Sequence, residues 1–517
     1  MFATFSKLFG RTSVRSRTIR SHRTSTSSFA VEQLESRDML SVTSLWFSGS
    51  RLVIQTDNAA TAVTVNPSGS NISIVEGGSG RSWSYPSSWI GDLEFQGGAG
   101  NDRFVNNVYS LPTRAFGFGG DDYLEGYNGN DVYVGGAGDD SLVGYGGNDQ
   151  FWGQDGDDLL KGMAGNDSLY AGAGDDKVVG GDGNDYLFGE DGYDAVIGGA
   201  GSDSLYGGNH DDSLVTIDGA TTDYADGQAG RDTVWEDQNF VRVLFFSLPV
   251  YDTVYAEKVQ AVSSFANGAD RTLDGDAIAD PTDGTFYKNF ASNPLFGRYG
   301  PSVNDIDQEN LGDCWLMAPL GSLALDNPGA VRSMVADFGD GTYGVRLGNN
   351  FYRIDADLPT WNATSTDQQY AGLGHDGSLW VALVEKAYAH FRRGTNTYAS
   401  LSGGDPADAL RAYNLTGVGQ NYYAVGSNAT TLANDIYNHW NAYQATNICT
   451  GTVASGSPLV GNHCYSVTWV NRNSSGQVTS IVVRNPWGGD NTGGNPYISL
   501  TPAQLAACQI WVTWGNS

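Results

Sequence analysis

Between residues 117 and 215, polar and apolar positions repeat with a period of nine residues. Two positions after each recurring aspartate stands an apolar residue, from Leu124 to Leu214, and two positions before it stands Gly until His210 replaces it in the last copy. A fixed period of this kind predicts stacked structural repeats. The aspartates occupy one phase without a slip: Asp122, Asp131, Asp140, Asp149, Asp158, Asp167, Asp176, Asp185, Asp194, Asp203 and Asp212.

Each nine-residue unit combines a tight turn with a short strand. Glycine permits the positive φ angles of such a turn, and stacked copies can bury an apolar residue that one copy cannot. Clustered Asp side chains and turn carbonyls supply the hard oxygen ligands that Ca²⁺ prefers. The unit Gly-x-x-Gly-[Asp/Asn]-Asp-x-apolar-x resembles the RTX-type nonapeptide. That resemblance implies a parallel β-roll with two repeats per coil, and Ca²⁺ bound between coils by the eleven aspartates.

The charge of this region agrees with a calcium requirement. Residues 117–215 hold 19 Asp and 2 Glu against 2 Lys, a net charge of −19 within a 517-residue chain of net charge −30. Such a density keeps a chain unfolded by self-repulsion unless cations neutralise it. A disordered Gly/Asp-rich linker is the alternative, and the in-phase apolar residues argue against it. The acidic balance also argues against nucleic acid as a partner.

Different patterns flank the repeats. Residues 44–96 contain short runs of β-branched and aromatic residues between Gly, Asn and Ser, which predict a small β unit or a cap for the roll. The sequence GGAGND at 97–102 is out of phase with the series, although we place it in a roll domain of residues 97–215. The change at His210 suggests that the roll ends near it. Residues 216–296 form a linker or transition region.

The N-terminal segment, residues 1–43, is expected to be disordered. Its first 31 residues contain six basic side chains and no acidic one, without the apolar core of a secretory signal. The stretch VEQLESRDMLSV at 31–42 resembles the motif Leu-Glu-x-Arg-x-Leu-Leu-Ser of exported bacterial surface proteins, with Met39 in place of one leucine. We therefore expect an extracellular or cell-surface protein. No run approaches the roughly 18–20 apolar residues of a transmembrane segment.

From residue 297 the pattern changes to helices followed by strands. The stretches CWLMAPLGSLAL (314–325) and SLWVALVEKAYAHFRR (378–393) have helical periodicity. HCYSVTWVNR (463–472) and TSIVVRNPW (479–487) predict two strands around a Ser-Ser-Gly turn. Residues 297–517 therefore predict an α+β domain, and the whole chain is multidomain.

Cys314 stands at the start of the first predicted helix. A lone cysteine more often fills a core than reacts, but a helix N-terminus stabilises a thiolate and lowers its pKa. A thiol nucleophile also needs a base, a group that orients the base and donors for the oxyanion. His463 begins one predicted strand and Asn485 ends the next, so a hairpin would bring them together. Gln308, six residues before Cys314, can share the oxyanion with the Cys314 N–H.

Three blocks resemble the protease core of the calpains. They are GPSVNDIDQENLGDCWLMAPLGSLA, GSLWVALVEKAYAHF and NHCYSVTWVN…IVVRNPWGG, in the order of that family. The resemblance implies a papain-like cysteine endopeptidase with a helical part and a β-rich part. It makes Cys314 the nucleophile, His463 the base, Asn485 the residue that orients the base, and Gln308 the oxyanion donor.

The chain departs from the family pattern beside His463. Asn462 stands where the family usually has Gly, and Cys464 stands where Ala is common. A thiol at Cys464 could make the site sensitive to redox conditions. The sequence leaves open whether Cys449, Cys464 and Cys508 pair or stay free.

The function that these features predict is a calcium-dependent, calpain-like thiol protease attached to a calcium-binding β-roll. Its partners would be protein or peptide substrates and Ca²⁺, and association with the cell surface is a further expectation. A calcium-dependent surface or adhesion protein with an inactive protease-like domain is the alternative. A papain-fold transferase is a third reading that no residue favours.

Overall fold

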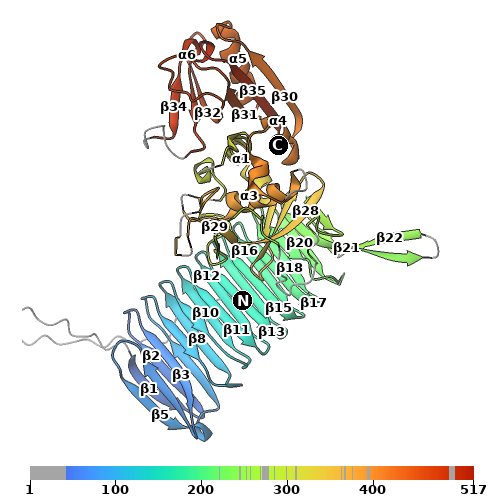
Figure 1. Cartoon of the computed structure of the whole chain (residues 1–517). Coiled ribbons are helices and arrows are strands. Elements are labelled where there is room, and N and C mark those ends of the chain that lie inside the picture. Colours follow the sequence, from blue (N-terminus) through green and yellow to red (C-terminus); the bar gives the residue numbers. More distant parts are fainter. Residues whose placement is uncertain are drawn as a thin grey trace, which may run out of the picture. The chain divides into compact units, whose positions relative to one another are not determined.

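The computed structural model describes residues 42–517 with internal gaps (Figure 1). The N-terminal basic segment and its Leu34–Ser41 motif lie outside the described residues. The residues from 40 onward form one compact unit. The gaps are residues 221, 244–245, 252, 257, 268, 270–278, 285, 299, 309–310, 363, 366–367, 375, 393–395 and 488–494.

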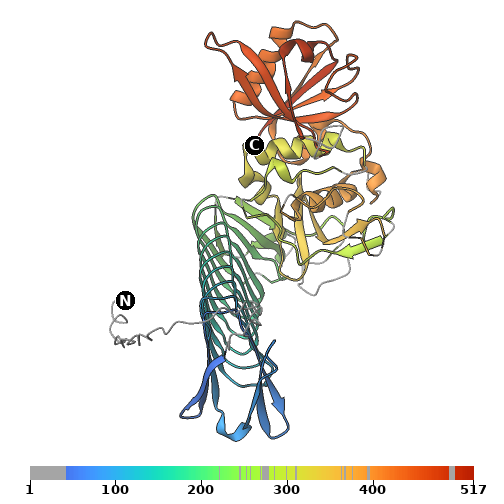
Figure 2. The same ribbon diagram turned by 90° about the vertical axis from the view of Figure 1, so that its left-hand side faces the viewer.

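Two long sheets face each other in the N-terminal half and form a β-roll, seen as stacked coils in Figure 2. Successive strands of the repeats alternate between the sheets. The 11-stranded sheet has the order β1 (Val42–Ser48), β2 (Arg51–Thr56), β6 (Asp92–Gln96), β8 (Thr113–Gly119), β10 (Val132–Ala137), β12 (Gln150–Asp155), β14 (Ser168–Ala173), β16 (Tyr186–Asp191), β18 (Ser204–Asn209), β20 (Tyr224–Ala229), β23 (Thr253–Tyr255). The 13-stranded sheet has the order β22 (Phe246–Tyr251), β21 (Thr233–Val243), β19 (Ser213–Thr216), β17 (Ala195–Gly201), β15 (Lys177–Gly183), β13 (Leu159–Ala164), β11 (Ser141–Gly146), β9 (Tyr123–Glu125), β7 (Arg103–Asn106), β3 (Ala62–Ser68), β4 (Asn71–Glu76), β5 (Ser82–Pro86), with β24 (Lys258–Val262) paired to β21.

Parallel neighbours within the nonapeptide region are shifted by 18 residues, which is two repeats. Tyr133 pairs with Phe151 in one sheet, and Leu142 pairs with Leu160 in the other. All eleven apolar residues that follow the aspartates are fully buried between the sheets. The predicted parallel β-roll with two repeats per coil is therefore confirmed.

The ladder continues beyond the regular repeats at both ends. The N–H of Asp102 donates to Asp122 Oδ1 (2.6 Å) across a 20-residue step, so the segment 97–102 joins the same column of aspartates. At the other end, the N–H of Asp212 donates to Asp232 Oδ1 (3.0 Å), also across 20 residues. The expectation that the roll ends near His210 is wrong, because a two-residue insertion breaks the period without breaking the ladder.

Antiparallel hairpins surround the first coil of the roll. β1 pairs with β2, and β3, β4 and β5 form a meander. The strands at this end of the two sheets, β1 and β5, are therefore short and belong to antiparallel hairpins. The buried Glu76 accepts a bond from Val42 N–H (2.8 Å) and forms an ion pair with Arg81 (2.5 Å). Edge strands that are short or covered resist pairing with other chains.

Among the described residues, the C-terminal half contains the helices and three smaller sheets. The helices are α1 (Cys314–Asp326), α2 (Pro328–Arg332), α3 (Trp380–Phe391), α4 (Pro406–Ala412), α5 (Ala429–Asn441) and α6 (Pro502–Ala506), with 3₁₀ turns at η1 (Ser87–Trp89) in the roll and at η2 (Val303–Asp305) and η3 (Tyr398–Leu401) here. β25 (Phe286–Asn289) pairs with β29 (Asp357–Thr360), and β26 (Val335–Asp337), β27 (Thr342–Leu347) and β28 (Asn350–Asp355) form a second sheet. The six-stranded sheet has the order β30 (Thr416–Tyr423), β35 (Ile510–Asn516), β31 (Ala445–Thr450), β32 (Cys464–Arg472), β33 (Val478–Arg484), β34 (Tyr497–Leu500).

Helix α1 joins the helical part to the six-stranded sheet. Ser322 Oγ donates to Thr446 O (2.9 Å), and Ser466 Oγ donates to Ala318 O (2.8 Å). One apolar core surrounds α1 and α3, and a second lies between α5, α6 and the sheet. The two predicted helices and the predicted hairpin are present, and the α+β architecture is confirmed.

A third apolar cluster connects roll strands with the sheet β26–β28. Trp235 on β21 is fully buried, and its ring meets Phe338 edge to face with centroids 6.0 Å apart. Val179 and Ile197 of the roll belong to the same cluster. Lys177 of β15 forms an ion pair with Asp337 at the end of β26. Folded roll strands therefore supply part of the surface on which the C-terminal half packs.

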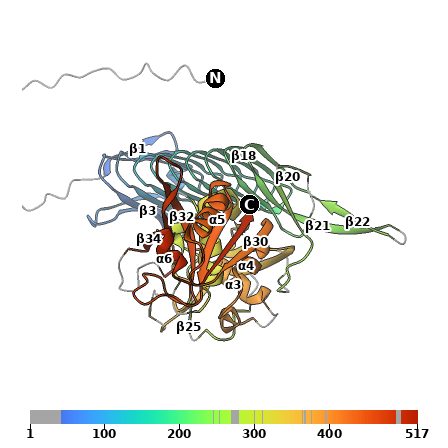
Figure 3. The same ribbon diagram turned by 90° about the horizontal axis from the view of Figure 1, so that it is seen from above.

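In the part of the chain that the structure describes, the helices are too short or too polar to span a bilayer. Figure 3 looks down on the C-terminal elements and shows α5, β30 and β32 together at this end of the compact unit.

Candidate active site

Cys314 is the first residue of α1 and is 9% exposed. The helix begins where Leu316 N–H and Met317 N–H both bond to Asp313 O. Trp315 follows Cys314, and its indole N–H donates to Leu401 O (2.8 Å). These contacts fix the helix start, and with it the position of the thiol.

His463 and Asn485 meet at one end of the β32–β33 hairpin. His463 Nε2 lies 2.8 Å from Asn485 Oδ1, and both side chains are buried. The N–H of Trp487 donates to the same Asn485 oxygen (3.2 Å), which identifies that atom as an acceptor. Nε2 must then donate the bond to Asn485, so the lone pair of the neutral imidazole lies on Nδ1.

Two aromatic rings shield this hydrogen bond. The Trp487 ring lies 4.2 Å from the His463 ring, and Tyr465 contacts His463 edge to face at 4.9 Å. Exclusion of water strengthens a bond of this kind because the local dielectric constant is low. The imidazole is therefore held in one orientation.

A cavity of about 400 Å³ brings Cys314 and His463 together. Trp315, Gly403 and Gly404 line it from the helical part. The β-rich part contributes His463, Cys464 and Trp511, among others. Asn485 and Gln308 are not among its lining residues, so Asn485 acts from behind the imidazole.

Gln308 is buried beside this region and its backbone is tied to the hairpin. Its N–H donates to Pro486 O (2.7 Å), and its side-chain amide donates to Leu311 O. The chain from Gln308 to Cys314 is thus attached at both ends. The amide is held close to the start of α1, but in this state it bonds to the backbone.

The ionisation of the pair differs from the sequence-based expectation. Burial raises the pKa of Cys314 to about 11, and the neighbouring charge of Asp313 adds to the effect. Burial likewise lowers the pKa of His463 to about 4, against the opposing bond to Asn485. The prediction of a lowered thiol pKa is therefore wrong here, because desolvation outweighs the helix N-terminus. Thiol and imidazole are both neutral at pH 7.

Asp313 and Glu385 form a buried acidic pair that the sequence did not reveal. Burial raises the pKa of Asp313 to about 6 and raises that of Glu385 well above its ordinary range, with the Asp313 charge as the next cause. The raised pKa of Glu385 favours its protonated form. Ala371 N–H donates to Glu385 Oε2 (2.8 Å). The pair links α3 to the residue before Cys314.

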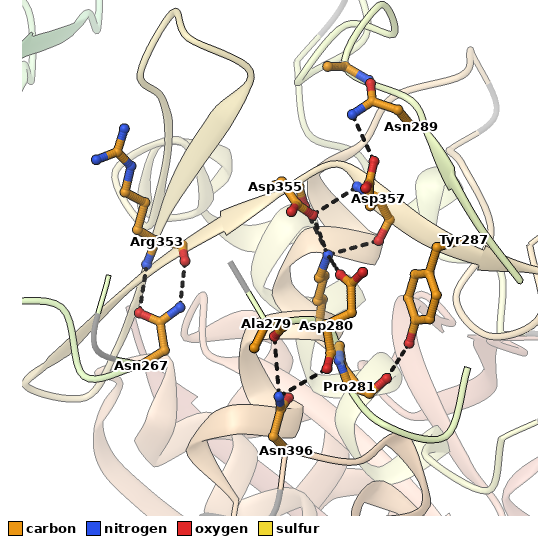
Figure 4. Close-up of polar contacts among 12 residues, drawn as sticks. Asn267, Ala279, Asp280, Pro281, Tyr287, Asn289, Arg353, Asp355, Asp357 and Asn396 are labelled. Carbon is orange, nitrogen blue, oxygen red and sulfur yellow. Dashed lines mark hydrogen bonds and ion pairs between the residues drawn. The ribbon is translucent and has the colours of Figure 1, made fainter. Parts of the chain in front are cut away.

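Lys386, the next residue on α3, anchors the segment that precedes the domain. It is fully buried, and its Nζ donates to Asp280 Oδ1 (2.6 Å) and Asp355 Oδ1 (2.5 Å). Figure 4 shows Asp280, Asp355 and Asp357 around this point, and Asn396 bonding to the carbonyls of Ala279 and Asp280. Breaking one partner of such a pair leaves a buried charge uncompensated.

The pairing of strands β31 and β32 shows which cysteines form a disulfide. Cys449 and Cys464 are directly opposite on β31 and β32 and form a disulfide, whereas Cys314 and Cys508 are free thiols. Both disulfide residues line the cavity of Cys314. Asn462 has φ of 54°, which explains why Asn replaces Gly there, since both tolerate the left-handed region.

The roll aspartates form two buried columns. The N–H of each bonds to Oδ1 of the aspartate one coil later, as Asp140 does to Asp158 (2.7 Å). Within the described residues, Oδ2 of ten predicted ligands is buried without a hydrogen bond, whereas Oδ2 of Asp131 accepts from Tyr133 (3.2 Å). Nine of these ten oxygens face a glycine, and Asp176 is the exception because Ala171 stands at the equivalent position; at Gly144 a Cβ would lie 1.9 Å from Asp149 Oδ2.

Burial raises the pKa of all eleven predicted ligands to between about 6 and 9. Asp131, Asp167 and Asp203 are lowest at about 6, and Asp212 is highest at about 9. The remaining values are about 7 or 8, for Asp122, Asp140, Asp149, Asp158, Asp176, Asp185 and Asp194. Buried oxygens without donors fit a cation. No group of three or more His, Cys, Asp or Glu side chains converges among the described residues, so backbone carbonyls would complete each site.

Comparison with known proteins agrees with both halves of the structure. Residues 287–496 match the calpain family cysteine protease model, and five overlapping segments within 115–216 match the RTX calcium-binding nonapeptide repeat. The chain is 28% identical over 236 residues to Calpain-A of Drosophila melanogaster, covering 41% of this chain and 27% of that protein. It is 29% identical over 217 residues to Calpain-9 of Rattus norvegicus, covering 38% and 30%. The chain thus spans less than a third of these relatives, and the resemblances to the calpain protease core and to the RTX-type nonapeptide are confirmed.

Proposed function

We propose that this protein is a calcium-dependent cysteine endopeptidase. The observation that carries the proposal is the His463–Asn485 hydrogen bond beside the cavity that His463 shares with Cys314. A base with a fixed tautomer next to a thiol is the arrangement that acyl transfer to cysteine requires. The match to the calpain protease model supports the same reaction.

In the proposed mechanism, His463 Nδ1 takes the proton of Cys314 as the thiolate attacks the peptide carbonyl carbon. Gln308 and the Cys314 N–H donate to the oxyanion, so Gln308 must exchange its bond to Leu311 O for the substrate. The imidazolium then protonates the leaving amine. Water, deprotonated by His463, hydrolyses the thioester and restores both groups.

The neutral Cys314 and His463 define a resting state. Ionisation of the pair would need substrate binding or a rearrangement that increases solvation of the thiol. We propose that Ca²⁺ in the roll is one condition for activity, because the coils that carry the aspartates also carry Trp235, Val179 and Ile197 of the cluster that packs on Phe338. Ca²⁺ neutralises carboxylates that otherwise oppose folding of those coils.

The alternative is a calcium-dependent surface or adhesion protein with an inactive protease domain. The neutral pair is the observation that favours it, since a thiol with a pKa of about 11 is a poor nucleophile at pH 7. We favour the protease because the orienting bond and the cavity are both formed.

The test is cleavage of fluorescent casein by the full chain over a range of Ca²⁺ concentrations. We expect activity with calcium, at least about a thousandfold loss in Cys314→Ala, and little change in Cys508→Ala, which removes the other buried free thiol. A peptidyl chloromethyl ketone should alkylate Cys314 and spare Cys508. If the wild type cleaves nothing at any Ca²⁺ concentration, the adhesion alternative replaces the protease.

We further propose export to the outside of the cell. The basic N-terminal segment, its resemblance to exported surface proteins and the RTX-type repeats support this location. Protease shaving of intact cells, followed by detection of the chain, tests it. Full protection until the cells are lysed would place the protein inside.

A further inference from the structure

One outer face of the roll has a side-chain pattern that the calcium sites do not use. It lies on five neighbouring parallel strands, β12, β14, β16, β18 and β20. The residues that point inward on these strands, such as Phe151 and Leu187, are fully buried. The side chains that alternate with these inward residues face outward, as the two-residue period of a strand requires.

The first component is an aromatic ladder of Trp152, Tyr170, Phe188 and Tyr206. These side chains are in register on four consecutive strands. Their ring centroids are 5.7, 4.8 and 4.7 Å apart, and successive planes lie within 6° of each other. The rings are only partly buried. They give this face a continuous apolar wall.

The second component is a groove of about 450 Å³ immediately beside the ladder. Gly172, Ala173 and Gly208 form low points along it. Carboxylates and amides line the rest, and no Lys or Arg of the described chain is among the lining residues. The polar lining consists of Gln154, Asp155, Glu190, Asp191, Asn209 and Gln228.

The third component is an alternation of bulky and bare positions, which we call the comb. Along the five strands the same position holds Gln154, Gly172, Glu190, Gly208 and Gln228. Gln154, Glu190 and Gln228 have φ of 91°, 79° and 68°, in the left-handed region that favours glycine. Each costs roughly 1–2 kcal/mol there. Backbone strain that is retained at alternate coils indicates that these side chains have a function.

The spacing of the comb identifies the kind of partner. Neighbouring strands lie about 4.8 Å apart, so comb side chains on alternate strands repeat every ~9.5 Å. That length is close to one disaccharide of an extended β-1,4-linked glycan. Each disaccharide would then meet the same set of groups: an apolar wall formed by the edges of the stacked rings, and carboxylate and amide oxygens for its hydroxyls. The acidic lining disfavours anionic polymers.

We propose that this face binds an extended, uncharged β-1,4-linked glycan. The sugar chain lies along the stack of coils in the groove that the comb residues line, beside the aromatic ladder. The proposal is independent of proteolysis, since none of these residues belongs to the candidate active site. It would hold the enzyme on a polysaccharide surface.

Calorimetric titration of the full chain in saturating Ca²⁺ tests the proposal, with cellohexaose and chitohexaose as probes and maltohexaose as the α-1,4-linked comparison. We expect binding of at least one β-1,4-linked probe and at least tenfold weaker binding of maltohexaose. The comb variant Gln154→Gly/Glu190→Gly/Gln228→Gly should lose at least tenfold in affinity. It should not unfold, because Gly relieves the strain at each position.

The matched control is Tyr145→Gly/Met163→Gly, which relieves the same left-handed strain (φ of 69° and 80°) on the opposite sheet. It should keep glycan affinity within twofold and casein cleavage should be unchanged in both variants. Failure of both β-1,4-linked probes to bind overturns the proposal. So does equal affinity in the comb variant, equal binding of maltohexaose, or a preference for an oligolysine peptide that depends on the same residues.

Discussion

The roll and the protease half both bury many carboxyl groups, but they neutralise them in different ways. In the protease half, buried groups have partners from the same chain: Lys386 pairs with Asp280 and Asp355, and Ala371 N–H donates to Glu385 Oε2. In the roll, buried Oδ2 atoms such as that of Asp158 have no donor among the described residues. The protease half supplies partners for its buried carboxyl groups from its own residues, whereas the roll must bind cations from the solvent. Only the roll should therefore respond strongly to Ca²⁺ and to pH.

Removal of calcium should produce the largest difference between the two halves. Circular dichroism should show loss of most roll β-structure in EGTA and its return with excess Ca²⁺, because each carboxylate left charged and buried costs about 1.4 kcal/mol per unit of pKa shift. Mg²⁺ at the same concentration is the control and should restore less. Identical β content in EGTA and Ca²⁺ would contradict this account of the roll.

Without calcium, pH should replace the cation. The folded-state pKa values of the eleven aspartates, about 6 to 9, lie above the ordinary value of about 3.9, so the unfolded chain loses its protons first as pH rises. The associated stability is fully present below about pH 4 and is lost as pH rises through 6 to 9. The melting temperature of calcium-free protein should thus fall between pH 5 and pH 8. A rise over that interval would show that these carboxylates are not buried in the protonated form.

The acidic pair provides the corresponding test in the protease half. Glu385→Ala should lower the free energy of unfolding of this half by about 1–3 kcal/mol, since it leaves Ala371 N–H buried without its acceptor. Glu385→Gln keeps an acceptor and a donor and should cost less than about 1 kcal/mol. Urea unfolding followed by tryptophan fluorescence measures both. The comparison would fail if either variant shifted the calcium midpoint of roll folding instead.

The smallest effect concerns one position of the repeat. His210 has φ of 83° where nine earlier copies have glycine with positive φ, so His210→Gly should stabilise the roll by about 1 kcal/mol. Gly201→Ala is the opposite change, since its Cβ would lie 1.6 Å from Gly183 O. Thermal melts in Ca²⁺ should move in opposite directions. A loss in both variants would mean that the His210 side chain contributes more than its strain costs.

Much of this architecture could be predicted because the signals are periodic or contiguous. The nine-residue phase fixed which residues face the interior of the roll, and the short segment between His463 and Asn485 restricted them to one hairpin. The two further coils could not be predicted, because the insertion between Asp203 and Asp223 breaks the nine-residue period. The ladder of hydrogen bonds continues there because it depends only on backbone pairing.

The parts that could not be predicted depend on burial and on long separations in sequence. Asp313 and Glu385 are 72 residues apart, and nothing local indicates that α3 lies behind the start of α1. The raised pKa of Cys314 could not be predicted either. Its place at a helix N-terminus predicts a lowered pKa, and the burial that raises the pKa is not visible in the sequence. The Cys449–Cys464 pairing similarly required the register of β31 and β32.

The 18-residue register of the roll has an evolutionary consequence. Away from the strands that pack on the C-terminal half, each coil bonds to the coils beside it and repeats the same contact from an aspartate N–H to the next carboxylate. Duplication or deletion of two nonapeptides would therefore lengthen or shorten the stack by one strand spacing, about 4.8 Å, without requiring compensation elsewhere. Gene rearrangement can adjust this part of the molecule in whole steps, while the protease half must change residue by residue.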